Sequence, residues 1–228
     1  LKFGLFAPDA GDPRPLMSGQ VDRIGGDGAE IRATAADGTA LADGAPRRLD
    51  DHGAALGQVL DLLGEAFPDA RIAAVGHRVV HGGPDLDAPV RLTPARLEEL
   101  DRFSPFAPLH QPHNLAAIRA AMEAFPAARQ VACFDTAFHR GQPWVADTYA
   151  LPRQYYEQGV RRYGFHGLSY TYVAGALRDI APDIANGRVI IAHLGNGASM
   201  AAMRNGEPMG STLGFTAVEG LPMGTRSG

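Results

Sequence analysis

The sequence predicts an α/β fold, and three observations support this prediction. Short apolar runs rich in β-branched residues, at 71–75 (RIAAV), 130–134 (QVACF) and 188–192 (RVIIA), have the composition of buried strands. Segments with apolar residues at helical spacing alternate with these runs. Glycines and polar residues follow directly where the runs end, which is where α/β sheets hold their ligands.

Composition narrows the class of protein. The chain has 228 residues, of which 45% are hydrophobic and 20% are charged, as in ordinary globular domains. Its net charge of −4 gives no reason to expect nucleic acid or an anionic membrane as a partner. A single cysteine, Cys133, excludes an internal disulfide, and no signal peptide or long apolar run is present. We therefore expect a cytoplasmic protein.

The first part of the chain predicts strands followed by a helix. Residues 1–6 form a short strand-like run, and residues 17–48 alternate short runs with Gly and Asp, as in a β-meander with exposed turns. Asp50 and Asp51 are expected to cap a helix. The apolar face of that helix would contain Leu56, Val59, Leu60, Leu63 and Phe67.

Residues 76–83 (GHRVVHGG) combine two histidines, an arginine and glycines after a predicted strand. His77 and His81 have the i,i+4 spacing of a metal-binding pair on a helix, but the glycines and the Val-Val pair argue against a helix. We instead expect the end of the strand to present Arg78. Its planar guanidinium suits a carboxylate or a phosphate, and a structural ion pair is the alternative.

The middle of the chain adds two candidate polar residues. Thr93 and Pro94 predict the start of a helix. His110 lies in a loop bounded by prolines before another predicted helix; it is either held rigidly for catalysis or an ordinary surface residue. Asp135 follows the strand at 130–134, where it could orient a ligand, act as a base, join a metal shell or cap the next segment.

The last third predicts a linker and then a second group of candidates. Residues 146–158 have a weak pattern, typical of a linker. His166 lies between glycines just before a helix that Ser169 is expected to cap. After the strand at 188–192, residues 195–197 (GNG) allow positive φ and could form an anion-binding turn, or simply a hairpin. Residues 205–206 (NG) predict a second hairpin, and Arg226 is a second arginine between small residues.

Six stretches spread from residue 76 to the end resemble the acetate kinase family, in the family's order. They are GHRVVHGG, FAPLHQPHNL, VACFDTAFH, RRYGFHG, HLGNGAS and GFTAVEGLPMGTRSG. The resemblance implies a fold of the actin, sugar kinase and Hsp70 (ASKHA) type, with two related α/β domains. Residues 1–150 would form the first domain, on the side of the acyl substrate. Residues 151–228 would begin the second, on the side of the ATP phosphates, and leave it incomplete.

The resemblance also implies roles for individual residues. Asp135, His166 and Arg226 would be catalytic, and Arg78 and His110 would bind substrate. The apolar lining around the acyl methyl would be Val80, Leu109 and Phe165. The ATP-binding residues would be Lys2, His193, Leu194, Gly195, Asn196 and Gly197. This chain departs from the family at Ala217, where the family has proline, and at Tyr170, where it has histidine.

The implied function is reversible phosphoryl transfer from ATP to acetate, with Mg²⁺, in a protein that forms a homodimer when full length. A propionate or other short-chain acyl kinase, or a fragment without activity, are the alternatives. The family has a phosphate-loop strand before the position of Leu1, and its magnesium ligands follow the position of Gly228. We therefore expect no metal ligand in these residues and little activity from this chain alone.

Overall fold

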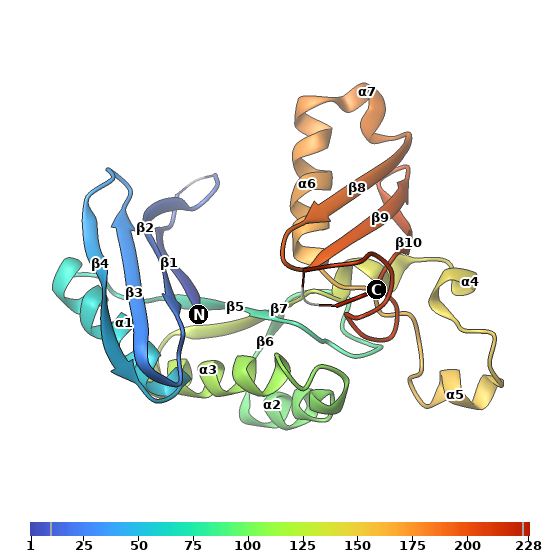
Figure 1. Ribbon diagram of the computed structural model, residues 1–228. Coiled ribbons are helices and arrows are strands. Elements are labelled where there is room, and N and C mark those ends of the chain that lie inside the picture. The colour runs from blue at the N-terminus through green and yellow to red at the C-terminus, as the bar shows by residue number, and fades with distance from the viewer. Residues whose placement is uncertain (10, 225) are drawn as a thin grey trace. The chain divides into compact units, whose positions relative to one another are not determined.

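The computed structural model describes residues 1–9, 11–224 and 226–228, so Thr225 of the last motif lies outside the described residues. Contacts divide the chain into two compact units (Figure 1). Unit 1 comprises Leu1–Ala73 and Ala116–Ala127, and unit 2 comprises Ala74–Leu115 and Ala128–Gly228. The domain boundary expected near residue 150 stays a prediction.

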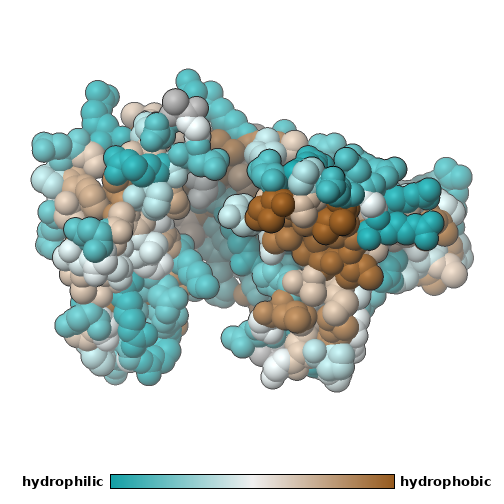
Figure 2. Space-filling model, turned by 90° about the horizontal axis from the view of Figure 1, so that it is seen from above, coloured by the Kyte–Doolittle hydropathy of each residue, from teal (hydrophilic) through white to brown (hydrophobic). Residues whose placement is uncertain are grey.

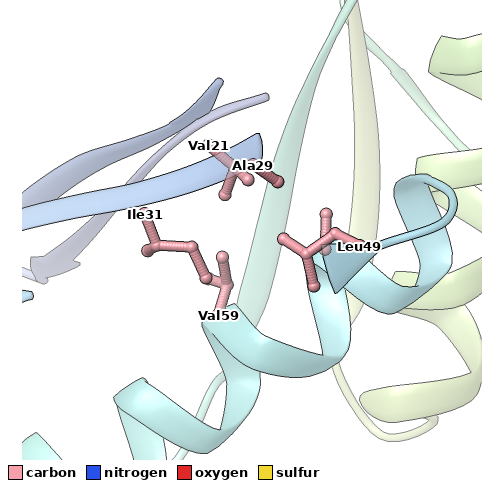
Figure 3. Close-up of a cluster of buried hydrophobic side chains, with 6 residues drawn as sticks. Val21, Ala29, Ile31, Leu49 and Val59 are labelled. Carbon is pink, nitrogen blue, oxygen red and sulfur yellow. The ribbon is translucent and has the colours of Figure 1, made fainter. Parts of the chain in front are cut away.

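Unit 1 contains the predicted β-meander. Its strands are β1 (Lys2–Ala7), β2 (Arg14–Asp22), β3 (Gly26–Ala35) and β4 (Ala40–Leu49), paired antiparallel in chain order. Helix α1 (His52–Ala66) begins after Asp51, whose carboxylate accepts the Ala54 N–H, so the predicted cap is confirmed. Figure 3 shows the core between sheet and helix, where apolar side chains of β2, β3 and β4 meet Val59.

The first sheet of unit 2 holds the strand that carries Arg78. Strand β5 (Ala74–Val79) pairs in parallel with β7 (Arg129–Phe134), and β6 (Val90–Arg91) pairs antiparallel with β7. The sequence predicted a strand at 71–75, whereas the observed strand, β5, begins and ends later in the chain. Because β7 supplies a parallel neighbour along its whole length, β5 continues through Gly76 to Val79, and Arg78 lies inside the strand.

The helices that follow β6 along the chain agree with the sequence. Helix α2 (Pro94–Asp101) begins after Thr93, whose hydroxyl accepts the Arg96 N–H. A short 3₁₀ turn, η1 (Ser104–Phe106), precedes helix α3 (Gln111–Ala124). A second one, η2 (Ala137–Gly141), follows β7. No helix among the described residues is long and apolar enough to cross a membrane.

The second sheet of unit 2 is antiparallel and made of neighbouring strands. Strands β8 (Arg188–Leu194), β9 (Ala198–Arg204) and β10 (Glu207–Ser211) lie in the order β10-β9-β8. Asn205 and Gly206, both at positive φ, form the predicted turn between β9 and β10. Tyr170 and Ala174 of helix α6 (Gly167–Ile180) pack against apolar residues of β8 and β9. Helix α7 (Pro182–Ala185) precedes β8.

Unit 2 leaves several large apolar side chains on its surface. Ile180 of α6, Ile184 of α7 and Ile190 of β8 are exposed. Figure 2 shows apolar side chains gathered on the surface of the molecule.

Residues 146–158, where a linker was expected, contain helical structure, since helices α4 (Trp144–Asp147) and α5 (Arg153–Glu157) lie in and around them. Buried Asp147 organises the segment: its carboxylate lies 3.0 Å from Arg140 Nη1 and accepts the Tyr156 hydroxyl at 2.9 Å. Ser169 is not the cap of α6, since the helix begins two residues earlier with His166 at the N-cap position.

Candidate active site

Parallel pairing of β5 and β7 brings Arg78 to Asp135. Arg78 lies opposite Cys133, and Asp135 follows the end of β7. Arg78 Nη2 donates to Asp135 Oδ2 at 2.6 Å, and Nε lies 3.1–3.2 Å from both carboxylate oxygens. This hydrogen bond raises the pKa of Arg78. The ion pair considered for Arg78 therefore exists, and Asp135 does not cap the next segment.

The exposures of the two partners differ. The Asp135 side chain is 2% exposed, whereas that of Arg78 is 65% exposed. Arg78 is thus held by a buried carboxylate through Nε and Nη2, while most of its side chain is exposed to solvent. A charged, planar donor that is fixed but accessible suits an anionic ligand.

His166 is placed by the start of α6 against the end of β7. The Gly167 N–H donates to the Asp135 carbonyl oxygen at 2.8 Å. A Cβ on Gly167 would lie 2.3 Å from that oxygen, so only glycine allows this approach. His166 adopts the left-handed conformation, with φ of 60°. The backbone thus joins His166 directly to the Asp135 turn.

The glycine turn of residues 195–197 connects β8 to β9. The Gly195 N–H donates to the Gly197 carbonyl at 3.1 Å, so the hairpin alternative is correct as geometry. The positive φ that the sequence allows is not used here, because the positive-φ residues of the described chain lie elsewhere. Close approach explains Gly197 instead: a Cβ there would lie 3.2 Å from His166 Nε2 and 3.4 Å from Arg226 Nη2.

Two hydroxyls and a second ring surround His166. Its Nδ1 lies 2.7 Å from Ser199 Oγ, and the Tyr170 hydroxyl also hydrogen-bonds to Ser199 Oγ. The His166 ring stacks on His193 with centroids 4.2 Å apart, and His193 Nδ1 lies 3.0 Å from Ser169 Oγ. Sequence reasoning missed Ser199, which lies on another element. The i,i+4 spacing of His166 and Tyr170 was a signal for the proximity of those two side chains alone.

Electrostatic interactions link the polar residues of unit 2. Burial, followed by His193, lowers the pKa of His166 to about 4; Arg78 and Arg226 lower it further and Asp135 opposes them. Burial also lowers the pKa of His110, which precedes α3, and the same two arginines add to this effect. Both histidines are therefore neutral at pH 7, beside two permanent positive charges.

Arg226 is held without an acidic partner in the part of the chain that the structure describes. Its Nε lies 2.9 Å from Met223 Sδ, and its carbonyl accepts the Met223 N–H at 2.9 Å. Since none of the described ion pairs includes Arg226, its charge is available for a ligand. Glu219 holds the preceding segment by accepting the Tyr149 hydroxyl at 2.6 Å and the Phe215 N–H at 2.9 Å.

The three expected apolar residues are not all together. Val80 and Phe165 are buried in one cluster with Tyr163 and Leu213, against which Phe215, Ala217 and Met223 pack. Leu109 is 79% exposed and lies outside this cluster. The cluster therefore contains two of the three expected lining residues, and Ala217 packs against it.

The expected ATP-binding residues fall in two places. His193, Leu194 and residues 195–197 share the hairpin of β8 and β9 in unit 2, with the Leu194 side chain exposed. Lys2 lies on β1 in unit 1. Its role stays a prediction, because the geometry of either unit alone does not test it.

The two histidines with metal-like spacing do not converge. His77 Nε2 lies 2.7 Å from Gln130 Oε1, while His81 is buried among aromatic rings and its Nδ1 accepts the Gly83 N–H. Within residues 1–9, 11–224 and 226–228, no group of three His, Cys, Asp or Glu side chains could hold a metal ion.

Comparisons with known proteins agree on one family. The family model described as the acetokinase family matches residues 1–228. An acetate kinase of Nitrobacter hamburgensis is 53% identical over 234 residues, covering 100% of this chain and 57% of that protein. The crystal structure of Porphyromonas gingivalis acetate kinase has 38% identity and a TM-score of 0.84. That of a propionate kinase from Francisella tularensis subsp. tularensis has 33% identity and a TM-score of 0.89.

Both structures match all of this chain, which covers 58% of each of them. The chain thus spans less than two thirds of the length of the relatives that it matches.

Proposed function

Because the chain belongs to the acetokinase family and has the ASKHA-type α/β fold over the part that it spans, we propose that the full-length protein is an acetate kinase. It transfers the γ-phosphoryl group of ATP to acetate and gives acetyl phosphate and ADP. A carboxylate oxygen forms the new bond to phosphorus while the bond to the ADP oxygen breaks, and the bonding electrons leave with ADP.

The chemistry needs positive charge rather than a base. Acetate is ionised at pH 7, like Asp and Glu with reference pKa values of about 4, so no proton has to be removed from it. The obstacle is repulsion between a carboxylate and the phosphates. Fixed donors aimed at the transferring group lower this barrier, and such positioning is the main contribution of proteins to phosphoryl transfer.

The observation that carries the proposal is the convergence at Gly197. His166 Nε2 and Arg226 Nη2 lie within 3.4 Å of the space where a Cβ on Gly197 would stand, so a bare backbone lies between a neutral imidazole and a guanidinium. Arg226 has no acidic partner among the described residues, and Arg78 faces solvent over most of its side chain. We assign these three side chains to the transferring phosphoryl group and the acyl carboxylate.

ATP is the proposed phosphoryl donor, and Mg²⁺ the proposed cofactor. Mg²⁺ is usually held by one or two carboxylates together with substrate phosphates, and neutralises phosphate charge when bound. Asp135 is the carboxylate at this site, but it is buried and both of its oxygens accept hydrogen bonds from Arg78, so it orients that guanidinium rather than binding the metal. The carboxylates that would hold Mg²⁺ are expected in the remainder of the full-length protein.

Propionate is the second candidate substrate, favoured by one observation. Ala217, where the family has proline, packs against the cluster of Val80 and Phe165. A smaller, unringed side chain at this wall would leave room for one more methylene than a proline. Acetate and propionate would then differ modestly, because one methylene in an apolar pocket is worth about 1–3 kcal/mol.

Trapping of acetyl phosphate tests the proposal. The full-length protein is incubated with ATP, Mg²⁺ and acetate, and hydroxylamine converts the product to acetyl hydroxamate. We expect acetate-dependent hydroxamate, and a loss of roughly a hundredfold in Arg226→Ala. No product from a folded, full-length protein would contradict the proposal.

We also infer from the family that the full-length protein is a homodimer and is located in the cytoplasm. Light scattering in the same buffer tests whether it is a homodimer.

A further inference from the structure

Two buried hydroxyls hold His166 from the side opposite Gly197. Ser199 Oγ lies 2.7 Å from His166 Nδ1, and the Tyr170 hydroxyl bonds to the same Ser199 oxygen. Ser199 and Tyr170 are both fully buried. The transfer itself uses neither hydroxyl, so their arrangement calls for another reason.

Counting protons distinguishes three possible arrangements of this chain of bonds. Each hydroxyl carries one proton and can accept two bonds, and a neutral imidazole carries one proton on either Nδ1 or Nε2. If Tyr170 donates to Ser199 and Ser199 donates to Nδ1, both hydroxyl protons are used and the imidazole proton is on Nε2. If Nδ1 instead donates to Ser199 and Ser199 to Tyr170, the phenol proton has no acceptor among the described residues. If Nδ1 and Tyr170 both donate to Ser199, the serine proton has none there.

Burial disfavours the second and third arrangements. A buried donor that loses its partner costs about 1–3 kcal/mol, because water cannot replace the bond. Burial raises the pKa of Tyr170, so the phenol keeps its proton at neutral pH and remains a donor. The first arrangement therefore pairs every buried proton of the network, and the other two each leave one unpaired.

We propose that Tyr170 and Ser199 are positioning residues that lock His166 as the neutral Nε2–H tautomer. The lock aims an N–H, without a full charge, at the space beside Gly197 and Arg226. The role of this tautomer in catalysis rests on the proposed function, whereas the tautomer itself does not. Burial lowers the pKa of His166 to about 4, so the imidazole is neutral at pH 7 and has a single N–H to place.

Three elements build the lock. Helix α6 supplies His166 at its N-cap and Tyr170 one turn later. Strand β9 supplies Ser199, which lies opposite His193 in the register with β8. The His193 ring then stacks on His166 and restricts its rotation. An ordinary buried hydrogen bond would need none of this convergence.

Histidine nitrogen NMR measures the tautomer directly. The full-length protein is labelled with ¹⁵N-histidine, and the His166 signals are identified by their loss in His166→Gln. At pH 7 we expect a protonated Nε2 and an unprotonated Nδ1. A protonated Nδ1, or an even mixture of tautomers, in the unmodified protein would overturn the proposal without any variant.

Variants then test which residues impose the tautomer. In Ser199→Ala we expect a tautomer mixture and a roughly tenfold lower kcat, with KM within about threefold. In Tyr170→Phe we expect a roughly threefold lower kcat, and Ser199→Thr should retain the Nε2–H form. Ser211→Ala and Tyr156→Phe, which remove hydroxyls away from His166, are the matched controls. An unchanged tautomer in folded Ser199→Ala and Tyr170→Phe would overturn the lock.

The readouts separate the two proposals. An Nε2–H tautomer in a protein that makes no acetyl phosphate would contradict the proposed function alone. Full kinase activity with His166 in the Nδ1–H form would contradict the lock alone.

Discussion

The two compact units differ in what they bury. Unit 1 closes on a plain apolar core of Val21, Ile31, Leu49 and Val59, with short residues between them. Unit 2 also buries His81, Asp135, His139, Asp147 and Ser199, and most buried polar side chains of the described residues lie there. An apolar core stabilises the folded state because its side chains are removed from water. Each buried polar group, by contrast, needs a hydrogen-bond or charge partner.

This difference is consistent with the location of the candidate site in unit 2. Buried polar groups contribute little to stability when paired and cost stability when unpaired. Unit 2 nevertheless keeps His81 Nε2 and His139 Nδ1 buried without a hydrogen-bond partner. We infer that substitutions of the buried polar residues of unit 2 change activity or pH response, whereas substitutions in the apolar core of unit 1 change stability alone.

Removal of the two site arginines should have the largest effect. We expect Arg78→Ala and Arg226→Ala, in the full-length protein, each to lose about 3 kcal/mol of transition-state stabilisation, roughly a hundredfold in kcat/KM. Lysine at either position should rescue only in part, because a point charge lacks the bidentate geometry. Arg48→Ala in unit 1, where the side chain is 71% exposed, is the control. Near-normal kcat/KM in both alanine variants would exclude these arginines from the site.

Acid should destabilise the protein through the buried histidines of unit 2. Burial lowers the pKa of His81 to about 3 and that of His139 to about 4, both below the ordinary value of 6.5. Below pH 6.5 the unfolded chain therefore binds protons that the folded chain does not, and stability falls with pH. Each group should cost about 2 kcal/mol between pH 6.5 and 5.

Urea unfolding at several pH values measures this loss. His139→Gln keeps a donor for the Phe165 carbonyl, which His139 Nε2 reaches at 3.0 Å, and should reduce the pH slope by about one proton. A slope equal to that of the unmodified protein would show that His139 titrates normally in the folded state.

Glycine-to-alanine changes should lower activity in unit 2 and raise stability in unit 1. At Gly197 an added Cβ would stand 3.2 Å from His166 Nε2, so the imidazole has to shift, and we expect about tenfold lower kcat/KM with little loss of stability. At Gly57 in α1 nothing lies within 4 Å of an added Cβ, and Gly57→Ala should stabilise by about 0.5–1 kcal/mol. Enzyme kinetics and thermal unfolding on both variants decide the comparison; equal activity would contradict the assignment of Gly197.

The smallest effect should concern acyl selectivity. With Ala217 beside Val80 and Phe165, we expect propionate to be used within about tenfold of acetate, and Ala217→Pro to shift the ratio toward acetate by less than that. Val59→Ala, in the apolar core of unit 1, should lower stability and leave the ratio unchanged. A preference for acetate above a few hundredfold in the unmodified protein would show that Ala217 enlarges nothing.

Local patterns predicted unit 1 and the hairpins well. Asp51 and Thr93 cap their helices as expected, and residues 205–206 turn the chain, because caps and tight turns depend on neighbouring residues alone. The differences came from partners far along the chain. Pairing with β7 extended β5, and the buried Asp147 ordered the segment expected to be a linker.

Contacts between residues far apart in the chain also limited what the sequence could predict about the site. Arg78, Asp135 and His166 were proposed from sequence, and their contacts are consistent with a common site, but their roles stay predictions. Ser199 was missed because its hydroxyl has meaning only beside Nδ1 of a histidine in another element. Gly197 was proposed for its backbone freedom, whereas the structure uses its lack of a side chain.

The register of the two sheets in unit 2 has a consequence for the order of folding. Glu207 pairs with Arg204 across a tight turn, so the sheet of β8, β9 and β10 can form from local contacts. Ala74 pairs with Arg129, and closing so long a loop is slow. We therefore expect amides of β9 to become protected before those of β5 in pulsed hydrogen exchange during refolding; the reverse order would contradict this. The Arg78–Asp135 pair would then appear only in the late phase, and a newly made chain would have a folded hairpin sheet before it could bind an anion.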